Sequence, residues 1–117
     1  MRGAFQSAGQ NCIGIERFLV HTEVYDEFVK MMAPKVRQLS IGAPLHSGGK
    51  RVDMGSMISD RPLATLERLI NDAVLSGARL LAGGKRWGNP TFPLGHYFEP
   101  TLLVDVTSDM EISRTEL

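Results

Sequence analysis

Two amphipathic helical patterns constrain the fold of this chain most strongly. The first places Val24, Phe28, Met32, Val36 and Leu39 at near-helical spacing, which gives one apolar face. Helices of this kind bury their apolar stripe against another layer of the domain. The pattern therefore predicts a helix with one side in the core.

The ends of this first helix are also marked in the sequence. Thr22 is a plausible N-cap, and acidic residues follow it, where the helix dipole favours negative charge. Pro34 interrupts the pattern and predicts a kink or an early stop. Gly42 and Pro44 end the element.

The second helical pattern follows a glycine-rich stretch, residues 42–56, which we interpret as a solvated loop. Ser59 or Asp60 caps this helix, Pro62 lies in its first turn, and Gly77 fits its C-terminal stop. Six apolar residues form the predicted core face: Leu63, Leu66, Leu69, Ile70, Ala73 and Val74.

Short apolar runs alternate with the helices. Residues 18–21 are predicted to form a buried strand, residues 79–82 a second strand, and residues 97–106 a third, entered through Pro100. Strands that alternate with helices are typical of an α/β layered fold with a largely parallel sheet. Residues 85–96 are predicted to form an irregular loop.

Composition limits the classes of protein that are possible. The 117 residues make one domain at most, and 13 basic residues balance 13 acidic ones, so nothing suggests a nucleic-acid partner. No run is apolar enough to span a bilayer, and no secretory signal is visible. The location of the protein stays unknown, with an intracellular site favoured. A single cysteine excludes an internal disulfide.

That cysteine lies in the most informative stretch, Phe5-Gln-Ser-Ala-Gly-Gln-Asn-Cys-Ile-Gly-Ile-Glu-Arg17. Small residues around Cys12 allow a close approach of backbone to ligand. The stretch resembles the reactive-cysteine segment of the aldehyde dehydrogenase superfamily, roughly Phe-x-x-x-Gly-Gln-x-Cys-x-x-x-x-Arg. Phe5, Gly9, Gln10, Cys12 and Arg17 carry the match.

The resemblance continues along nearly the whole chain. Gly42-Ala-Pro44 matches a family Gly-x-Pro turn, and Tyr97-Phe-Glu-Pro-Thr101 matches an aromatic-x-x-Pro-Thr strand. Glu116 falls on the glutamate of the family's Glu-Glu-x-Phe-Gly-Pro motif, although Thr115 departs from the first glutamate. The chain departs again where the family has Gly-Pro, at Gly55-Ser56. The resemblance implies the αβα catalytic domain of aldehyde-dehydrogenase type, incomplete in residues 1–117, with the NAD(P)-binding domain outside this chain.

The same resemblance implies a chemistry. Cys12 would be the catalytic nucleophile that attacks a small-molecule aldehyde, forming a thiohemiacetal and then a thioester, with its backbone N–H as one oxyanion donor. Glu116 would bind the nicotinamide ribose of NAD or NADP, and Asn11 and Ile13 would flank the substrate pocket. The second oxyanion donor and the general base are family residues that the chain lacks. The complete enzyme would be a homo-oligomer.

Plainer interpretations stay open. A free cysteine is often a buried small apolar residue, and Gln10 and Asn11 could satisfy local backbone groups instead of lining a pocket. Arg17 is expected in a structural ion pair. The three histidines lack metal-ligand spacing with Cys12, so no metal site is predicted. The alternative to an enzyme fragment is an inactive piece that serves only in folding or at an oligomer interface.

Overall fold

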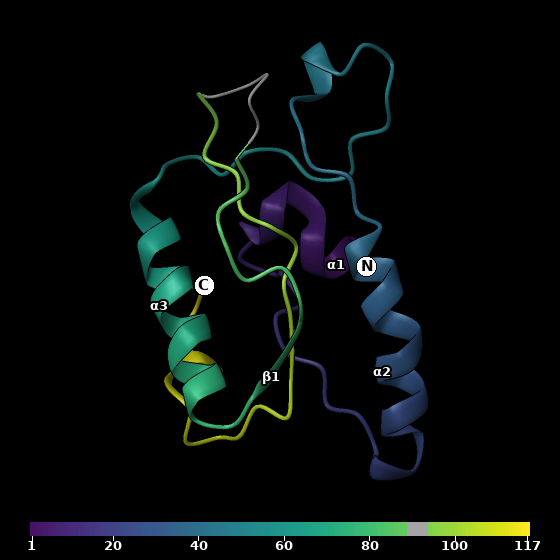
Figure 1. Cartoon of the computed structure of the whole chain (residues 1–117), viewed down its shortest axis with the longest axis vertical. Coiled ribbons are helices and arrows are strands. Elements are labelled where there is room, and N and C mark those ends of the chain that lie inside the picture. The colour runs from purple at the N-terminus through teal and green to yellow at the C-terminus, as the bar shows by residue number, and fades with distance from the viewer. Residues whose placement is uncertain (89–93) are drawn as a thin grey trace.

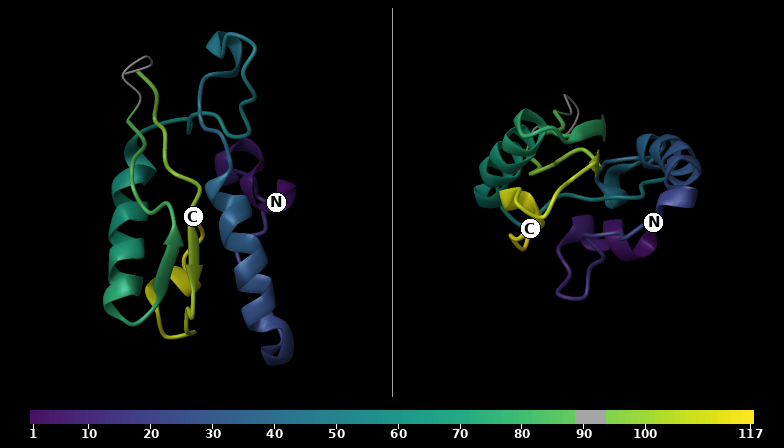
Figure 2. Two further views of the ribbon diagram at one scale, coloured as in Figure 1. Left: turned by 45° about the vertical axis from the view of Figure 1, so that its right-hand side comes forward. Right: turned by 90° about the horizontal axis from the view of Figure 1, so that it is seen from below.

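Two long helices lie on opposite sides of a pair of strands, which gives αβα layers (Figures 1 and 2). The structure is a computed structural model that describes residues 1–88 and 94–117. The described elements, in chain order, are α1 (Arg2–Phe5), η1 (Gln6–Gly9), α2 (Thr22–Arg37), η2 (Pro44–His46), α3 (Arg61–Leu75), β1 (Arg79–Ala82), β2 (Leu102–Val104) and η3 (Glu111–Ser113). The expected layering is confirmed.

Helix α2 starts one residue earlier than predicted. His21, not Thr22, is the N-cap, and its Nδ1 accepts a hydrogen bond of 3.3 Å from the Glu23 backbone N–H. Histidine caps the helix because its ring nitrogen takes the place of the usual hydroxyl or carboxylate acceptor.

Pro34 does not end α2, which runs three residues further to Arg37. The Pro34 carbonyl still accepts from the Gln38 N–H at 3.1 Å, so the last turn keeps its hydrogen bonds. Val36 is the best-buried residue of the predicted face, at 1% exposed, whereas Val24 near the other end is exposed. The helix therefore packs mainly through its C-terminal half.

Helix α3 follows the sequence prediction closely. Asp60 is at the N-cap position, although its side chain makes no capping hydrogen bond, and Gly77 follows the helix with a φ of +108° that suits glycine. Four residues of the predicted core face are buried: Leu63, Leu69, Ile70 and Ala73. Val74 was wrongly placed on that face, because it lies at its edge and is 41% exposed.

The two strands pair antiparallel, so the largely parallel sheet that the sequence suggested is wrong for the described residues. Strand β1 has its predicted bounds, but β2 is only three residues long within the predicted 97–106. Among the described residues between β1 and β2 there is no crossover helix of the kind that a parallel pair requires. A register shift between Leu80 and Ala82 further shortens the ladder.

The strand predicted at residues 18–21 is absent. Those residues have no regular structure, Leu19 is 93% exposed, and the Phe18 ring is tilted against that of Phe28 at a centroid distance of 6.3 Å. An apolar run forms a strand only beside another strand. No strand among residues 1–88 and 94–117 pairs with this one.

Of the two predicted loops, residues 42–56 are fully described and residues 85–96 are described in part. Residues 42–56 are irregular apart from η2, and an isolated bridge joins Ile41 to Met54 at their ends. The predicted loop 85–96 falls partly on residues outside the described part of the chain. Its described ends are held by bridges of Arg86 with Phe98 and of Met57 with His96.

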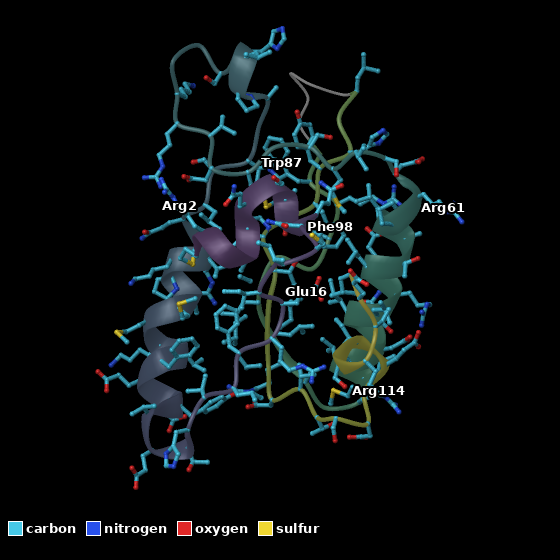
Figure 3. The ribbon with its side chains drawn as sticks, turned by 180° about the vertical axis from the view of Figure 1, so that it is seen from behind. Arg2, Glu16, Arg61, Trp87, Phe98 and Arg114 are labelled. Atoms are coloured by element: carbon cyan, nitrogen blue, oxygen red, sulfur yellow. The ribbon has the colours of Figure 1, made fainter. Side chains whose placement is uncertain are left out.

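The core lies between α3 and the strands. Its main cluster contains Met57, Leu63, Ile70 and Phe98, and Ala8 of the N-terminal segment packs against it. Figure 3 shows that segment crossing the molecule close to the labelled Phe98. The core thus fixes where the residues just before Cys12 lie.

Candidate active site

The Cys12 loop begins with an unusual left-handed turn. Ser7, Ala8 and Gly9 have φ values of +55°, +58° and +80° in succession. Only glycine adopts this region freely, so Ser7 and Ala8 hold a costly conformation. Ala8 is kept there by its packing against the core cluster. The turn reverses the chain and presents the next residues at the surface.

The backbone amides of residues 10–15 are almost all occupied. The N–H of Gln10 donates to Ser7 O at 3.2 Å, that of Asn11 to Gly9 O at 2.8 Å, and that of Gly14 to Asn11 O at 2.7 Å. The Ile13 N–H donates to Asn11 Oδ1, and the Ile15 N–H donates to Gly3 O. Within the described residues, only the Cys12 N–H of these six has no acceptor.

The Cys12 side chain is at the surface, so the buried-cysteine interpretation is wrong. Its Sγ lies 3.9 Å from Asn11 Oδ1, a weak S–H···O contact. The same Asn11 oxygen accepts from the Ile13 N–H at 3.3 Å, which makes a local turn. Asn11 therefore uses its side-chain oxygen within the loop. The thiol and a free backbone N–H thus belong to one exposed residue.

The three residues 11–13 lie together, and Ile13 points its side chain outward, at 82% exposed. Gly14 closes the turn beneath them. A Cβ at Gly14 would lie 2.9 Å from Asn11 O and 3.4 Å from Gly9 O, both backbone atoms. The turn around Cys12 consequently requires glycine at this position for close packing of the backbone.

Glu116 lies at the other end of the chain, beyond η3. Its side chain is exposed and makes no hydrogen bond or ion pair within the described residues, and none connects it to residues 11–13. Nearby, Glu111 of η3 forms a two-pronged ion pair with Arg68 of α3 at 2.8 and 2.9 Å. This pair holds η3 on α3 and sets the path of the chain toward Glu116.

Arg17, for which an ion pair was predicted, makes none within the described part of the chain. A different interaction, which the sequence did not predict, connects the layers. Asp105 accepts from Tyr25 Oη and from Arg79 Nε, each at 2.5 Å. The Arg79 hydrogen bond, with that of Tyr25, lowers the pKa of Asp105, and burial raises the pKa of Tyr25. Asp105 is 80 residues from Tyr25 and 26 from Arg79 in the chain, so the sequence carries no spacing signal for this contact.

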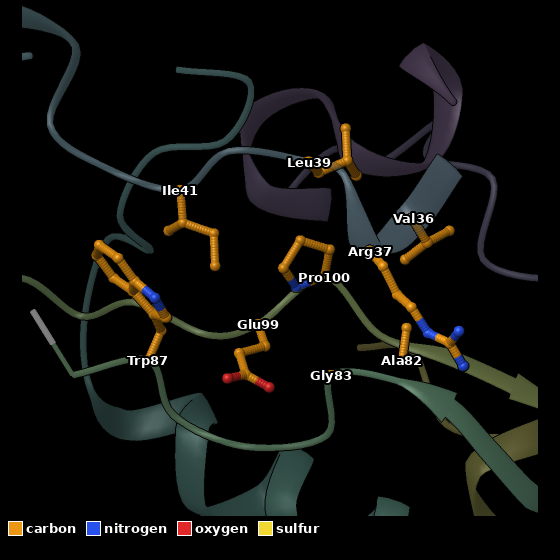
Figure 4. Close-up of a pocket in the computed structure, with 9 residues that line it drawn as sticks. All are labelled: Val36, Arg37, Leu39, Ile41, Ala82, Gly83, Trp87, Glu99 and Pro100. Carbon is orange, nitrogen blue, oxygen red and sulfur yellow. The ribbon is translucent and has the colours of Figure 1, made fainter. Parts of the chain in front are cut away.

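A shallow hollow of about 290 Å³ opens between the end of α2 and the strand region (Figure 4). Its lining includes Arg37, Trp87 and Glu99, and none of its residues belongs to the Cys12 loop. Arg37 is already engaged, because its guanidinium donates to Leu81 O at 2.9 and 2.7 Å. Among the described residues, the lining of the hollow includes no Cys, Ser, Thr or Lys, and it shares no residue with the candidate active site.

Residues 1–88 and 94–117 contain neither a cluster of metal-ligating side chains nor a helix that could span a membrane. No group of three or more His, Cys, Asp or Glu side chains is placed to hold a metal ion. No helix there has the length and apolar character that a membrane crossing requires.

Comparison with known proteins places this geometry in a family. The family model for the aldehyde dehydrogenase family matches residues 1–117. An aldehyde dehydrogenase-like protein of Saccharomyces cerevisiae is 52% identical over all of this chain and 18% of its own length. The chain therefore spans about a fifth of the relatives that it matches.

Solved structures of dehydrogenases also match this chain. A 3,6-anhydro-L-galactose dehydrogenase in complex with NADP matches 96% of this chain and 23% of its own, with 40% identity and a TM-score of 0.84. An aldehyde dehydrogenase of Bacillus cereus in complex with NAD+ matches 98% of this chain and 22% of its own, with 29% identity and a TM-score of 0.85. The match of the full sequence and of the fold shows that this chain belongs to the aldehyde dehydrogenase family.

Proposed function

We propose that the protein to which this chain belongs is an NAD- or NADP-dependent aldehyde dehydrogenase with Cys12 as its nucleophile. The observation that carries the proposal is the pairing of an exposed thiol with the one backbone N–H of residues 10–15 that has no acceptor among the described residues. A thiol that attacks a carbonyl needs a hydrogen-bond donor for the oxygen on which charge develops. Cys12 offers both groups from one residue.

The reaction begins when the Cys12 thiolate forms a bond to the aldehyde carbon. The carbonyl oxygen takes the displaced electron pair and accepts a hydrogen bond from the Cys12 N–H, and protonation of that oxygen gives a thiohemiacetal. When bound, NAD or NADP would supply the acceptor for the hydride that leaves the thiohemiacetal carbon, and loss of the hydroxyl proton to solvent would leave a thioester on Cys12. Water then cleaves the thioester, releasing a carboxylate and the free thiol. Removal of a single oxyanion donor typically costs about 3–4 kcal/mol in the barrier.

Glu116 is the residue of this chain that we propose to hold the cofactor. Its carboxylate is exposed and has no intramolecular partner among the described residues, so both oxygens are available to accept from ribose hydroxyls. The NAD+ and NADP complexes of the similar structures support a nicotinamide cofactor without choosing between the two.

Asn11 and Ile13 are the proposed substrate neighbours. The exposed Ile13 side chain stands beside the thiol and offers an apolar wall, whereas the Asn11 oxygen is shared with the loop backbone. Residues outside the 1–117 segment would supply the general base, the second oxyanion donor and the dinucleotide-binding domain. A homo-oligomer for the complete enzyme rests on the family resemblance alone.

A chimera tests the proposal. Residues 1–117 replace the matching segment of the 3,6-anhydro-L-galactose dehydrogenase, and NAD(P)H formation is measured with its aldehyde substrate. The proposal predicts turnover that Cys12→Ala abolishes and that Glu116→Ala weakens through a raised KM for the cofactor. A folded chimera whose turnover survives Cys12→Ala would show that Cys12 is not the nucleophile.

A further inference from the structure

One polar side chain, that of Gln10, connects the Cys12 loop to a distant segment of the chain. Its Nε2 donates to Ser7 O at 2.9 Å, and its Oε1 accepts from the Ile58 backbone N–H, also at 2.9 Å. One amide therefore braces the left-handed turn from inside the loop and connects it to a segment 48 residues away. Glutamine suits this task because a single side chain carries both donor and acceptor.

The segment that Gln10 reaches is itself firmly held. Met57 is a member of the main core cluster, and its N–H donates to His96 O at 2.8 Å. The His96 N–H in turn donates to Ser56 Oγ at 2.8 Å. Ile58 follows directly on this segment, just before α3. Gln10 thus anchors the exposed loop to a rigid part of the domain.

Other contacts of the loop to the rest of the chain act on its flanks. Ala8 packs on the core before the loop, and the Ile15 N–H donates to Gly3 O at 2.9 Å after it. Between these two points, and within the described residues, Gln10 makes the one side-chain hydrogen bond from residues 10–14 to a residue beyond the N-terminal segment. Asn11, by contrast, bonds only within the loop.

We propose that Gln10 is a positioning residue, which fixes the Cys12 thiol and N–H relative to the core for attack on the aldehyde. This rests on the proposed function, since it assigns Gln10 a role in that reaction. Gln10 reaches no reacting atom itself. Its effect comes through the orientation of the loop, where a misplacement of about 1 Å can cost on the order of a hundredfold in rate.

The functional test uses the chimera with Gln10→Ala and, as a matched control, Gln38→Ala. Gln38 is an exposed glutamine whose side chain makes no hydrogen bond within the described residues. We expect Gln10→Ala to lower kcat by about 10- to 100-fold with KM and Tm close to those of Gln38→Ala. Gln10→Glu keeps the acceptor for the Ile58 N–H but loses the donor to Ser7 O, so it should recover part of kcat.

The anchoring test uses residues 1–117 and does not depend on turnover. Hydrogen exchange at the Ile58 and Gly14 amides should quicken by about fivefold in Gln10→Ala, as expected for loss of one hydrogen bond, and stay unchanged in Gln38→Ala. Unchanged exchange at both amides overturns the proposal. A kcat equal to that of Gln38→Ala also overturns it. So does a loss of kcat that is accompanied by a Tm clearly below that of Gln38→Ala, because the loss would then reflect unfolding.

Failure of this proposal is distinct from failure of the proposed function. If Cys12→Ala abolishes turnover and Gln10→Ala behaves like Gln38→Ala, Cys12 remains the nucleophile and only the role of Gln10 is rejected. If turnover survives Cys12→Ala, the proposed function itself is rejected, whatever the exchange data show.

Discussion

Replacement of Gly14 by alanine should disturb the Cys12 turn by sterics alone. The added Cβ would lie 2.9 Å from Asn11 O and 3.4 Å from Gly9 O. Both atoms belong to the backbone, so neither can rotate away, and an ordinary contact requires the turn to open by about 0.5 Å. Opening also lengthens the hydrogen bond from the Gly14 N–H to Asn11 O, now 2.7 Å. Overpacking of this kind costs about 1–3 kcal/mol.

Gly55 provides the matched control, because a Cβ there meets nothing within 4 Å and its φ is not in the left-handed region. Gly55→Ala should change the free energy of unfolding by less than about 1 kcal/mol, and stabilisation is the expected sign because the unfolded chain becomes less flexible. Urea unfolding of both variants of residues 1–117 measures the difference. If Gly14→Ala is as stable as Gly55→Ala, the close backbone packing that we describe around Cys12 is wrong.

Three further predictions concern stability and activity. Leu69→Ala, at a side chain that is 0% exposed, should cost about 2–5 kcal/mol in urea unfolding, and Leu75→Ala, at 86% exposed, less than about 0.5 kcal/mol; similar costs would contradict the described core. The hydrogen bond from Arg79 lowers the pKa of Asp105, so its stabilisation is present above the ordinary value of 3.8 and is lost as pH falls below it through the folded-state pKa. Asp105→Asn should therefore lower Tm at pH 7, and the difference from wild type should shrink below pH 3.8; a constant difference would refute the interaction. Residues 1–117 alone should form no NADH from an aldehyde, because the second oxyanion donor and the base are missing, and NADH formation that Cys12→Ala removes would prove this wrong.

The sequence predicted best where the signal is local. Helix α3 and strand β1 have clear periodicity and glycine boundaries, and their bounds agree with the structure. The Cys12 motif is also contiguous, and the family match confirms the resemblance that it carried. Such features depend on neighbours along the chain, which a single sequence contains.

The errors arose where partners are distant. The apolar run at residues 18–21 has the composition of a strand, but no described strand lies beside it. Strand β2 pairs antiparallel with β1, and hydrophobic periodicity does not indicate whether two strands pair parallel or antiparallel. The hydrogen bond of Gln10 to Ile58 spans 48 residues and left no trace in spacing. For the candidate site, the contiguous motif predicted Cys12 as the nucleophile, and that assignment stays a proposal, whereas the contact between Gln10 and Ile58 required the structure.

The central claim is that Cys12 carries the substrate as a thioester. The most direct measurement is mass spectrometry of the chimera, acid-quenched within its first turnover and digested to release the peptide that contains Cys12. If Cys12 is the nucleophile, this peptide gains the mass of the acyl group of the substrate, and the gain is absent without NAD or NADP. NAD(P)H formed in the first turnover with no acyl group on Cys12, or with the acyl group on another residue, would contradict it.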